Sequence, residues 1–335
     1  MQENFYLVIG SGSIARRHIK NIKMIFPEST VVCVSASGRP LTKQECSADI
    51  VMGSLEAALQ FCRPEFAIVA SPAPFHIEQA LTLLREKIPT LIEKPVASNF
   101  SAIQAYVGEL LEYAQITEVA YNLRYLPSAV WVKKVIDDGG LGRLHSVHID
   151  VGQYLPDWRP QSDYSRNVSA RSELGGGVLL ELSHELDYLT WIFGQFETAY
   201  CLASQSGRLK IDVEDSADVI LSRRDGLTAT LHMDFLQRAT NRTCKVIAEY
   251  GTLLWNVATN SVCVLKPGGE CQELFADDAY DRNAMYLAEI ERFARVARGE
   301  LPPAVTIEEG LYILRLVDAL KTSSQRQQAI LIEAE

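Results

Sequence analysis

The chain has 335 residues, more than one ordinary hydrophobic core holds, so two domains are expected. Hydrophobic residues make up 47% and charged residues 22% of the sequence, a globular composition that excludes wholesale disorder. The net charge of −10 argues against binding to nucleic acid or to an anionic membrane surface, because both need a cationic face. No apolar run is long enough to span a bilayer, and the first residues show no signal-peptide pattern.

The seven cysteines are scattered and show no C-x-x-C spacing. An odd, scattered set is typical of reduced thiols that act as small hydrophobic residues. We therefore expect a cytoplasmic protein without a structural metal site.

Short apolar runs alternate with helical patterns in the first third of the chain. Strands are predicted at residues 5–9, 31–34, 66–70, 90–92 and 118–120, and helices at 14–24, 77–86 and 101–112. Strands that alternate with helices predict a parallel sheet, and we place this α/β domain at residues 1–121.

Strands dominate the rest of the chain. They are predicted at residues 146–151, 217–222, 228–233, 245–248, 253–257 and 262–265, with helices at 130–136, 284–298 and 307–321. Asp225-Gly226 separates two of these strands and predicts a hairpin. We expect an α+β domain at residues 122–335 with a large, mostly antiparallel sheet. An alternative for its closing helix, residues 307–321, is to pack back on the first domain.

A glycine-rich turn follows the first predicted strand and opens a helix. Gly10 permits a tight turn, Gly12 lets a pyrophosphate approach the backbone, and Ala15 lets the helix pack closely on the strand. Ser13 and Ile14 would present backbone amides to the anion at the helix N-terminus. The pattern predicts a Rossmann dinucleotide site; the alternative is a plain strand-to-helix turn.

The end of the second predicted strand bears on the choice of cofactor. An NAD enzyme places a carboxylate there for the ribose hydroxyls, but none occurs between Ser29 and Gln44. Ser35, Ser37 and Arg39 suit a 2′-phosphate instead, which favours NADP over NAD. The alternative is that Arg39 is a solvated loop residue.

Two further segments carry residues suited to proton chemistry. Lys94, in Glu93-Lys94-Pro95, follows a strand and would lie at the ligand-binding edge of a parallel sheet, although a solvated loop is the alternative. His184 follows three glycines on a predicted helix and shares a face with Glu181 and Asp187. A histidine beside a carboxylate suits general acid–base catalysis, and the alternative is a surface histidine with ordinary charged neighbours.

These segments together resemble the glucose–fructose oxidoreductase / inositol dehydrogenase / MocA (Gfo/Idh/MocA) family of NAD(P)-dependent oxidoreductases over nearly the whole chain. The matching pieces occur in the family's order: the glycine motif, Ser71-Pro72 with His76, Glu93-Lys94-Pro95, Asn122-Leu123-Arg124-Tyr125, the triple glycine with His184 and Asp187, and the closing helix.

The resemblance implies Lys94 and His184 as the catalytic pair. It also implies a nicotinamide side of the pocket lined by Ser71, Pro72, His76 and Glu93.

One position departs from the family pattern. Many relatives carry an Asp four residues before the active histidine, where this chain has Leu180. Glu181, one residue later, is our candidate for the third catalytic group, and its role is left open.

A loop in the second domain is dense in aromatic and basic residues, namely Tyr154, Trp158, Arg159, Arg166 and Arg171. Aromatic faces stack on sugar rings, and arginines bind carboxylates or phosphates. We expect these residues, with Arg124 and Asp187, to bind an acidic or nucleotide-linked sugar. The alternative is an arm that packs on a partner subunit. Analogy with family members that have a similar loop suggests a role in surface-polysaccharide sugar metabolism.

The expected function is an oxidoreductase that exchanges hydride between a nicotinamide and a hydroxyl or carbonyl carbon of a sugar-like substrate. The runner-up is a non-enzymatic NAD(P)-binding regulator of the same fold, and a non-sugar substrate is a third possibility. A homodimer or homotetramer is expected, because one face of the second sheet needs a partner.

Overall fold

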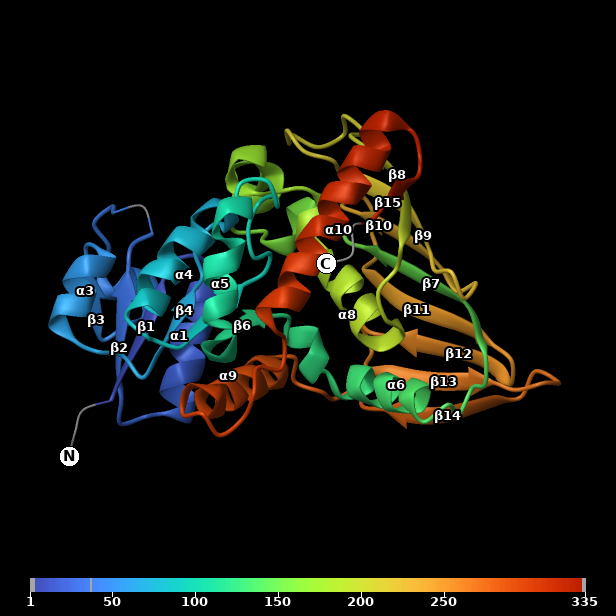
Figure 1. Cartoon of the computed structure of the whole chain (residues 1–335), viewed down its shortest axis with the longest axis horizontal. Coiled ribbons are helices and arrows are strands. Elements are labelled where there is room, and N and C mark those ends of the chain that lie inside the picture. The colour runs from blue at the N-terminus through green and yellow to red at the C-terminus, as the bar shows by residue number, and fades with distance from the viewer. Residues whose placement is uncertain (1–3, 37, 333–335) are drawn as a thin grey trace. The chain divides into compact units, whose positions relative to one another are not determined.

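The computed structural model describes residues 4–36 and 38–332. The chain forms two compact units, Met1–Asn122 with Arg282–Leu314, and Leu123–Asp281 with Arg315–Glu335 (Figure 1). The first unit therefore includes a segment from the C-terminal part of the chain.

The first unit contains a six-stranded parallel sheet in the order β3-β2-β1-β4-β5-β6. Its strands are β1 Phe5–Ile9, β2 Thr30–Val34, β3 Ile50–Met52, β4 Phe66–Val69, β5 Thr90–Glu93 and β6 Thr117–Ala120. Its helices are α1 Ser13–Ile25, α2 Lys43–Cys46, α3 Leu55–Phe61, α4 His76–Arg85, α5 Val107–Glu112 and α9 Asn283–Ala297. Helix α10, Ile307–Arg326, contributes residues to both units. The strand order reverses between β1 and β4, where open α/β sheets bind ligands.

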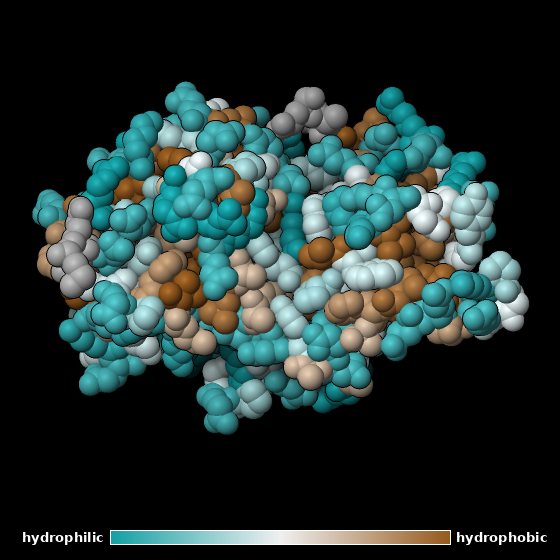
Figure 2. Space-filling view, turned by 90° about the horizontal axis from the view of Figure 1, so that it is seen from below, coloured by the Kyte–Doolittle hydropathy of each residue, from teal (hydrophilic) through white to brown (hydrophobic). Residues whose placement is uncertain are grey.

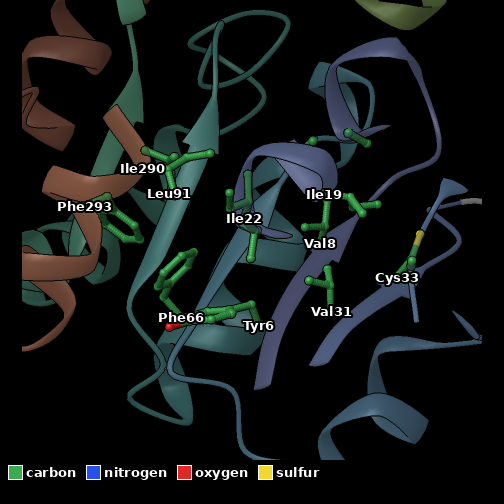
Figure 3. Close-up of a cluster of buried hydrophobic side chains, with 14 of the residues drawn as sticks. Tyr6, Val8, Ile19, Ile22, Val31, Cys33, Phe66, Leu91, Ile290 and Phe293 are labelled. Atoms are coloured by element: carbon green, nitrogen blue, oxygen red, sulfur yellow. The ribbon is translucent and has the colours of Figure 1, made fainter. Parts of the chain in front are cut away.

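Helices α1 and α9 cover one face of this sheet (Figure 3). Ile19 and Ile22 of α1 and Phe293 of α9 meet Tyr6 and Val8 of β1, and all five are at most 4% exposed. The spacing of three between the α1 residues places them on one helical face, as the sequence pattern predicts.

The second unit contains a nine-stranded sheet in the order β14-β13-β12-β11-β7-β10-β9-β8-β15. All neighbours are antiparallel except β7 and β10. The strands are β7 Leu144–Gly152, β8 Thr198–Ser204, β9 Ser216–Ser222, β10 Thr228–Asp234, β11 Asn241–Ala248, β12 Gly251–Asn256, β13 Ser261–Leu265, β14 Cys271–Ala276 and β15 Ile330–Leu331. The helices that begin in this unit are α6 Pro127–Asp137, α7 Val178–Glu181 and α8 Ser183–Phe193.

One face of the second sheet packs on α6 and α8. Trp255 of β12, 1% exposed, meets the ring of Tyr188 edge-on at 4.9 Å, and its Nε1 donates to Ser128 Oγ of α6 at 2.9 Å. Other side chains remain exposed on neighbouring strands, with Leu202 at 49% and Ile220 at 51%. Burial alternates along β9 and β10, so the sheet has one covered face and one more open face.

The predicted fold class is confirmed, two local predictions need correction, and some short elements were not predicted. The α-helix predicted at 101–112 begins only at Val107, after the 3-10 turn Gln104–Tyr106. The helix that carries His184 is interrupted at Leu182. Strand β3 was not predicted, because three residues are too few for a periodic signal.

Candidate active site

The glycine turn has the shape that a pyrophosphate needs. Gly10 has φ +125°, and a Cβ there would lie 2.4 Å from the carbonyl oxygen of Ala70, so only glycine fits. Around Gly12, in contrast, a Cβ would meet nothing within 4 Å. Gly12 is the N-cap of α1 and has no side chain to cap it, which leaves the first amides of the helix available to an anion. Ser13 and Ile14 begin the helix, and Ala15 is fully buried behind it.

A pocket of about 270 Å³ lies beside this turn in the same unit. Its lining includes Ile9 and Val34, which end the first two strands, Ser35 directly after the second strand, and Phe75 after the fourth strand. Ser35 is 6% exposed. The position and size of the pocket suit the adenosine half of a dinucleotide.

Arg39 is already paired with a carboxylate. Its Nη1 donates to Oε1 of Glu45 at 3.2 Å, and both side chains are about half exposed. The other oxygen of Glu45 accepts from the backbone N–H of Thr42 at 2.7 Å in a capping box. This contact lowers the pKa of Glu45, followed in effect by the Thr42 hydroxyl and Arg39. Ser37, the third predicted reader of a 2′-phosphate, lies outside the described residues.

His76 links the loops that follow β4 and β5. Its Nε2 lies 2.7 Å from the carbonyl oxygen of Ser71, and its Nδ1 lies 2.9 Å from that of Pro95. Burial lowers the pKa of His76, opposed by the two carbonyls and by Glu93. Pro72 joins Ser71 to this turn as the N-cap of the 3-10 helix Ala73–Phe75. The structure thus brings Ser71, His76 and the Lys94-Pro95 segment together.

Glu93 ends β5 and fixes the start of that segment. Its Oε1 lies 2.6 Å from Nε2 of His18, which is fully buried on α1, and its Oε2 accepts from the backbone N–H of Lys94 at 3.2 Å. Lys94 follows directly and is half-buried. The Lys94–Pro95 peptide bond is cis.

In the second unit, His184 is half-buried in the first turn of α8, and two residues that follow it on this helix form ion pairs. Asp187 of this helix binds Arg124, with Nη2–Oδ1 at 2.6 Å and Nε–Oδ2 at 3.1 Å. Glu185 binds Arg242 of β11, with Nε–Oε1 at 2.6 Å and Nη2–Oε2 at 3.0 Å. Both arrangements are bidentate, so they fix the orientation as well as the position of the helix.

The triple glycine packs tightly before α7. A Cβ on Gly176 would lie 2.3 Å from the carbonyl oxygen of Val168, and one on Gly177 would lie 2.4 Å from Oε1 of Glu214. At the end of α7, Glu181 accepts from the hydroxyl of Ser169 at 2.8 Å. Gly176 and Gly177 therefore have no room for a side chain, and the Ser169 hydrogen bond ties the end of α7 to the loop before it.

The loop rich in aromatic and basic residues is anchored by its aromatic side chains. The indole of Trp158 donates to the carbonyl oxygen of Gln153 at 3.2 Å, and the guanidinium of Arg238 lies 3.6 Å above the ring of Tyr154. Arg159 and Arg166 are exposed. Arg171 is shared between two carboxylates, Glu173 at 3.0 Å and Asp212 at 3.7 Å.

The residues in these contacts that were not identified from the sequence include His18, Glu45, Arg238 and Arg242. The capping-box pattern from Thr42 to Glu45 was a signal for Glu45. A polar residue on the buried face of an amphipathic helix was a signal for His18. The two arginines left no local signal, because their partners are distant in sequence.

Within the ranges 4–36 and 38–332, no group of three or more His, Cys, Asp or Glu side chains could hold a metal ion. In that same part of the chain, no helix combines the length and apolar character needed to cross a membrane.

Two family models match the chain. Residues 5–121 match the oxidoreductase family with an NAD-binding Rossmann fold, and residues 130–254 match the GFO/IDH/MocA C-terminal domain. Among curated proteins, the inositol 2-dehydrogenase of Streptomyces avermitilis is 25% identical over 86% of this chain and 84% of its own length. The myo-inositol 2-dehydrogenase of Thermotoga maritima is 23% identical over 97% of this chain and 98% of its own length.

Solved structures share the fold of the whole chain. The WlbA dehydrogenase from Bordetella pertussis, in complex with NADH and UDP-GlcNAcA, has a TM-score of 0.80 and 21% identity, and the match covers 100% of both chains. A levoglucosan dehydrogenase in complex with NADH and levoglucosan has a TM-score of 0.84 and 16% identity over 99% of this chain and all of its own. The resemblance inferred from the sequence motifs is confirmed: the chain belongs to the GFO/IDH/MocA family of oxidoreductases, with an NAD-binding Rossmann fold in its N-terminal part.

Proposed function

We propose that this chain is an NAD(P)-dependent dehydrogenase that moves hydride between the nicotinamide and a hydroxyl- or carbonyl-bearing carbon of a sugar or sugar derivative. The observation that carries the proposal is the set of hydrogen bonds around Lys94. Through these bonds Glu93, His18 and His76 fix the Lys94-Pro95 segment at the end of a parallel strand. The first unit would bind the cofactor and the second unit the substrate.

The residues of the first unit fit a dinucleotide. The Gly10 turn leaves no room for a side chain, Gly12 faces open space, and the pocket beside Ser35 has the volume for an adenosine. The pyrophosphate would be held by the first amides of α1, which add the favourable end of the helix dipole. Ser71, Pro72 and His76 are proposed to shape the nicotinamide side.

The finer cofactor preference is proposed to be NADP over NAD. Arg39 would bind the 2′-phosphate, with Ser35 close to the ribose, and Arg39 would first leave Glu45. An exposed ion pair of this kind is worth only about 0–1 kcal/mol, so a phosphate with more charge can replace the carboxylate. Competition from Glu45 for Arg39 would therefore reduce the preference for NADP over NAD without removing it.

Lys94 and His184 are proposed to handle the proton of the reacting hydroxyl. When bound, the nicotinamide supplies or accepts the hydride. The ammonium of Lys94 would stabilise negative charge on the substrate oxygen, and the imidazole of His184 would take its proton during oxidation and return it during reduction. Histidine suits both directions because an unperturbed imidazole gains and loses its proton near neutral pH. Glu181, held by Ser169, is proposed as the third group.

Arg124 and Asp187, expected among the substrate-binding residues, bond to each other. We propose that they serve the substrate site by holding α8, and thus His184, in place. The arginines that face solvent, Arg159 and Arg166, are proposed to bind an anionic part of the substrate. Tyr154 and Trp158 would provide the aromatic surface for a sugar ring.

An acidic or nucleotide-linked sugar is the substrate class that these side chains favour, and the solved WlbA structure holds such a compound, UDP-GlcNAcA. By analogy, we assign the chain to surface-polysaccharide sugar metabolism. The test is a screen of inositols, free sugars, sugar acids and nucleotide sugars with each cofactor, followed by the absorbance of the reduced nicotinamide. Turnover of an acidic or nucleotide-linked sugar well above that of the neutral sugars is the expected result.

A non-enzymatic NAD(P)-binding regulator is the second candidate function, because a dinucleotide site alone does not require catalysis. Tight cofactor binding together with no turnover of any compound in the screen would favour it. Retention of both Lys94 and His184 favours the enzyme.

The second sheet is proposed to form a homodimer or homotetramer in the cytoplasm. Leu202 and Ile220 are about half exposed on neighbouring strands β8 and β9, beside a surface pocket of about 290 Å³ that they help to line. Figure 2 also shows hydrophobic residues at the surface among hydrophilic ones. Closed symmetric assemblies are the common way to cover such a face.

A further inference from the structure

Three buried carboxyl groups lie close together in the first unit. Glu93 of β5, Glu118 of β6 and Glu289 of α9 are 7%, 0% and 1% exposed. Glu93 is paired with His18 at 2.6 Å. Glu118 accepts from the backbone N–H of Ala304 at 3.0 Å and lies 3.6 Å from Nη1 of Arg292. Two of the three carboxylates therefore have a basic partner.

Glu289 differs from the other two. Neither of its side-chain oxygens has a hydrogen-bond partner among residues 4–36 and 38–332. Burial raises the pKa of Glu289 well above its usual value, and the charges of Glu93 and Glu118 raise it further. This environment favours the neutral, protonated form of the Glu289 carboxyl group over the charged form.

His18 connects α1 to the proposed catalytic segment. It is fully buried, and Glu93 is the residue that it binds through Nε2. Glu93 in turn accepts the backbone N–H of Lys94 with its other oxygen. One carboxylate thus joins a rigid helix to the peptide group from which the Lys94 side chain extends.

Helices α1 and α9 also make polar contacts that do not involve His18 or Glu93. Asn21 and Asn283 exchange side-chain amide hydrogen bonds at 3.3 and 2.9 Å, and Arg17 lies 4.4 Å above the ring of Tyr286. Buried charges are costly, and apolar residues of similar size often give equal or greater stability. A buried histidine and its carboxylate partner next to Lys94, with a further buried acid that interacts with that carboxylate, therefore indicate a role in function.

We propose that His18 is a positioning residue for the reaction, acting through Glu93 on Lys94, and that Glu289 preserves this arrangement by holding a proton. This inference rests on the proposed role of Lys94. If Glu289 lost its proton, an uncompensated negative charge would lie near Glu93 and weaken the hold of Glu93 on the Lys94 peptide. The titratable groups that interact electrostatically with Glu289 are Glu93 on β5, Glu118 on β6 and Tyr286 on α9. Arg17 and His18 on α1 contact the ring of Tyr286, and Arg292 on α9 lies near Glu118.

The test of His18 uses the full chain with its cofactor and substrate. His18→Ala should lower kcat by roughly 10- to 100-fold, since small displacements of a reacting group cost this much, with little change in cofactor Kd. His18→Gln should recover most of the loss, because its side-chain N–H can donate to Glu93 from a similar position. Asn283→Ala is the matched control: it breaks a polar contact between the same two helices and should leave kcat unchanged.

The role proposed for Glu289 is tested by detecting the proton on its carboxyl group. Infrared difference spectra between the wild-type protein and Glu289→Gln, taken without cofactor at neutral pH, should show the C=O band of a protonated carboxyl group that the variant lacks. In activity measurements, the same variant should lose the alkaline fall in kcat that ionisation of Glu289 imposes on the wild type.

The possible failures are distinct. Wild-type turnover in Lys94→Ala would overturn the proposed function itself. If Lys94→Ala is inactive but folded His18→Ala turns over normally, the positioning role is wrong. If His18→Ala does not fold, His18→Gln decides the question, and activity as low as that of Lys94→Ala would contradict the hydrogen-bonding role. The absence of the protonated carboxyl band would overturn the part assigned to Glu289.

Discussion

Arg124 and Asp187 form a buried, bidentate ion pair three residues beyond His184, with side chains 5% and 0% exposed. Removal of one partner from such a pair leaves an uncompensated buried charge. We predict that Arg124→Ala lowers the free energy of unfolding by about 3–5 kcal/mol, measured by urea denaturation.

A surface pair in the first unit is the control for this variant. Arg85 binds Glu109 at 2.7 Å, but its side chain is 54% exposed. Arg85→Ala should cost no more than about 1 kcal/mol. Equal effects of the two substitutions would show that the Arg124 pair does not hold α8.

Cofactor selectivity should depend on Arg39 and Glu45. The wild-type protein should bind NADPH more tightly than NADH, and Arg39→Ala should weaken NADPH binding alone by about 1–3 kcal/mol. Glu45→Gln should strengthen NADPH binding, because it releases Arg39 from its carboxylate partner. Fluorescence titration of each reduced cofactor measures these constants, with Lys43→Ala on α2 as the control. Equal wild-type affinities for both cofactors would refute the NADP assignment and leave the dinucleotide site untouched.

The buried acid Glu289 should give the protein a pH-dependent stability. Its pKa is raised on folding. Its contribution to stability is therefore fully present below the unfolded-state pKa of about 4.3 and is lost as pH rises toward the folded-state pKa. In that window the free energy of unfolding should fall by about 1.4 kcal/mol per pH unit because of this group. Glu289→Gln should remove the slope in urea denaturation at a series of pH values. Parallel curves for the two proteins would mean that Glu289 is ionised in the fold.

The sequence predicted the parts of this molecule that depend on local pattern. The glycine turn, the alternation of strands and helices, and the Asp225-Gly226 hairpin each follow from the backbone preferences of a few neighbouring residues. Strand β3 and helix α3 were missed because they are short and their tertiary neighbours stabilise them.

The contacts around the candidate site were harder to predict. His18 and Glu93 are 75 positions apart, and Arg124 and Asp187 are 63 apart, so no local pattern joins them. Arg124 and Asp187 each looked like a substrate ligand when considered alone. The carboxylate that Arg39 binds lies at position 45, just beyond the segment in which a ribose-binding acid was sought.

Association through the second sheet should depend on its exposed apolar residues. The wild-type protein should have the mass of a dimer or tetramer in light scattering at micromolar concentration. Ile220→Asp should shift it toward the monomer, because a charge in an apolar contact is costly. Val130 on α6 is similarly exposed, at 49%, and Val130→Asp should leave the mass unchanged. A monomeric wild-type protein would contradict the proposed assembly.

The central claim is that Lys94 and His184 perform the proton chemistry of a dehydrogenase. The most direct measurement is the steady-state turnover of Lys94→Ala and His184→Ala with the substrate found by the screen, alongside the cofactor Kd of each variant. Each substitution should lower kcat by roughly 100-fold or more, while the cofactor Kd changes by less than about 1 kcal/mol. Turnover at the wild-type rate in either variant would contradict the account.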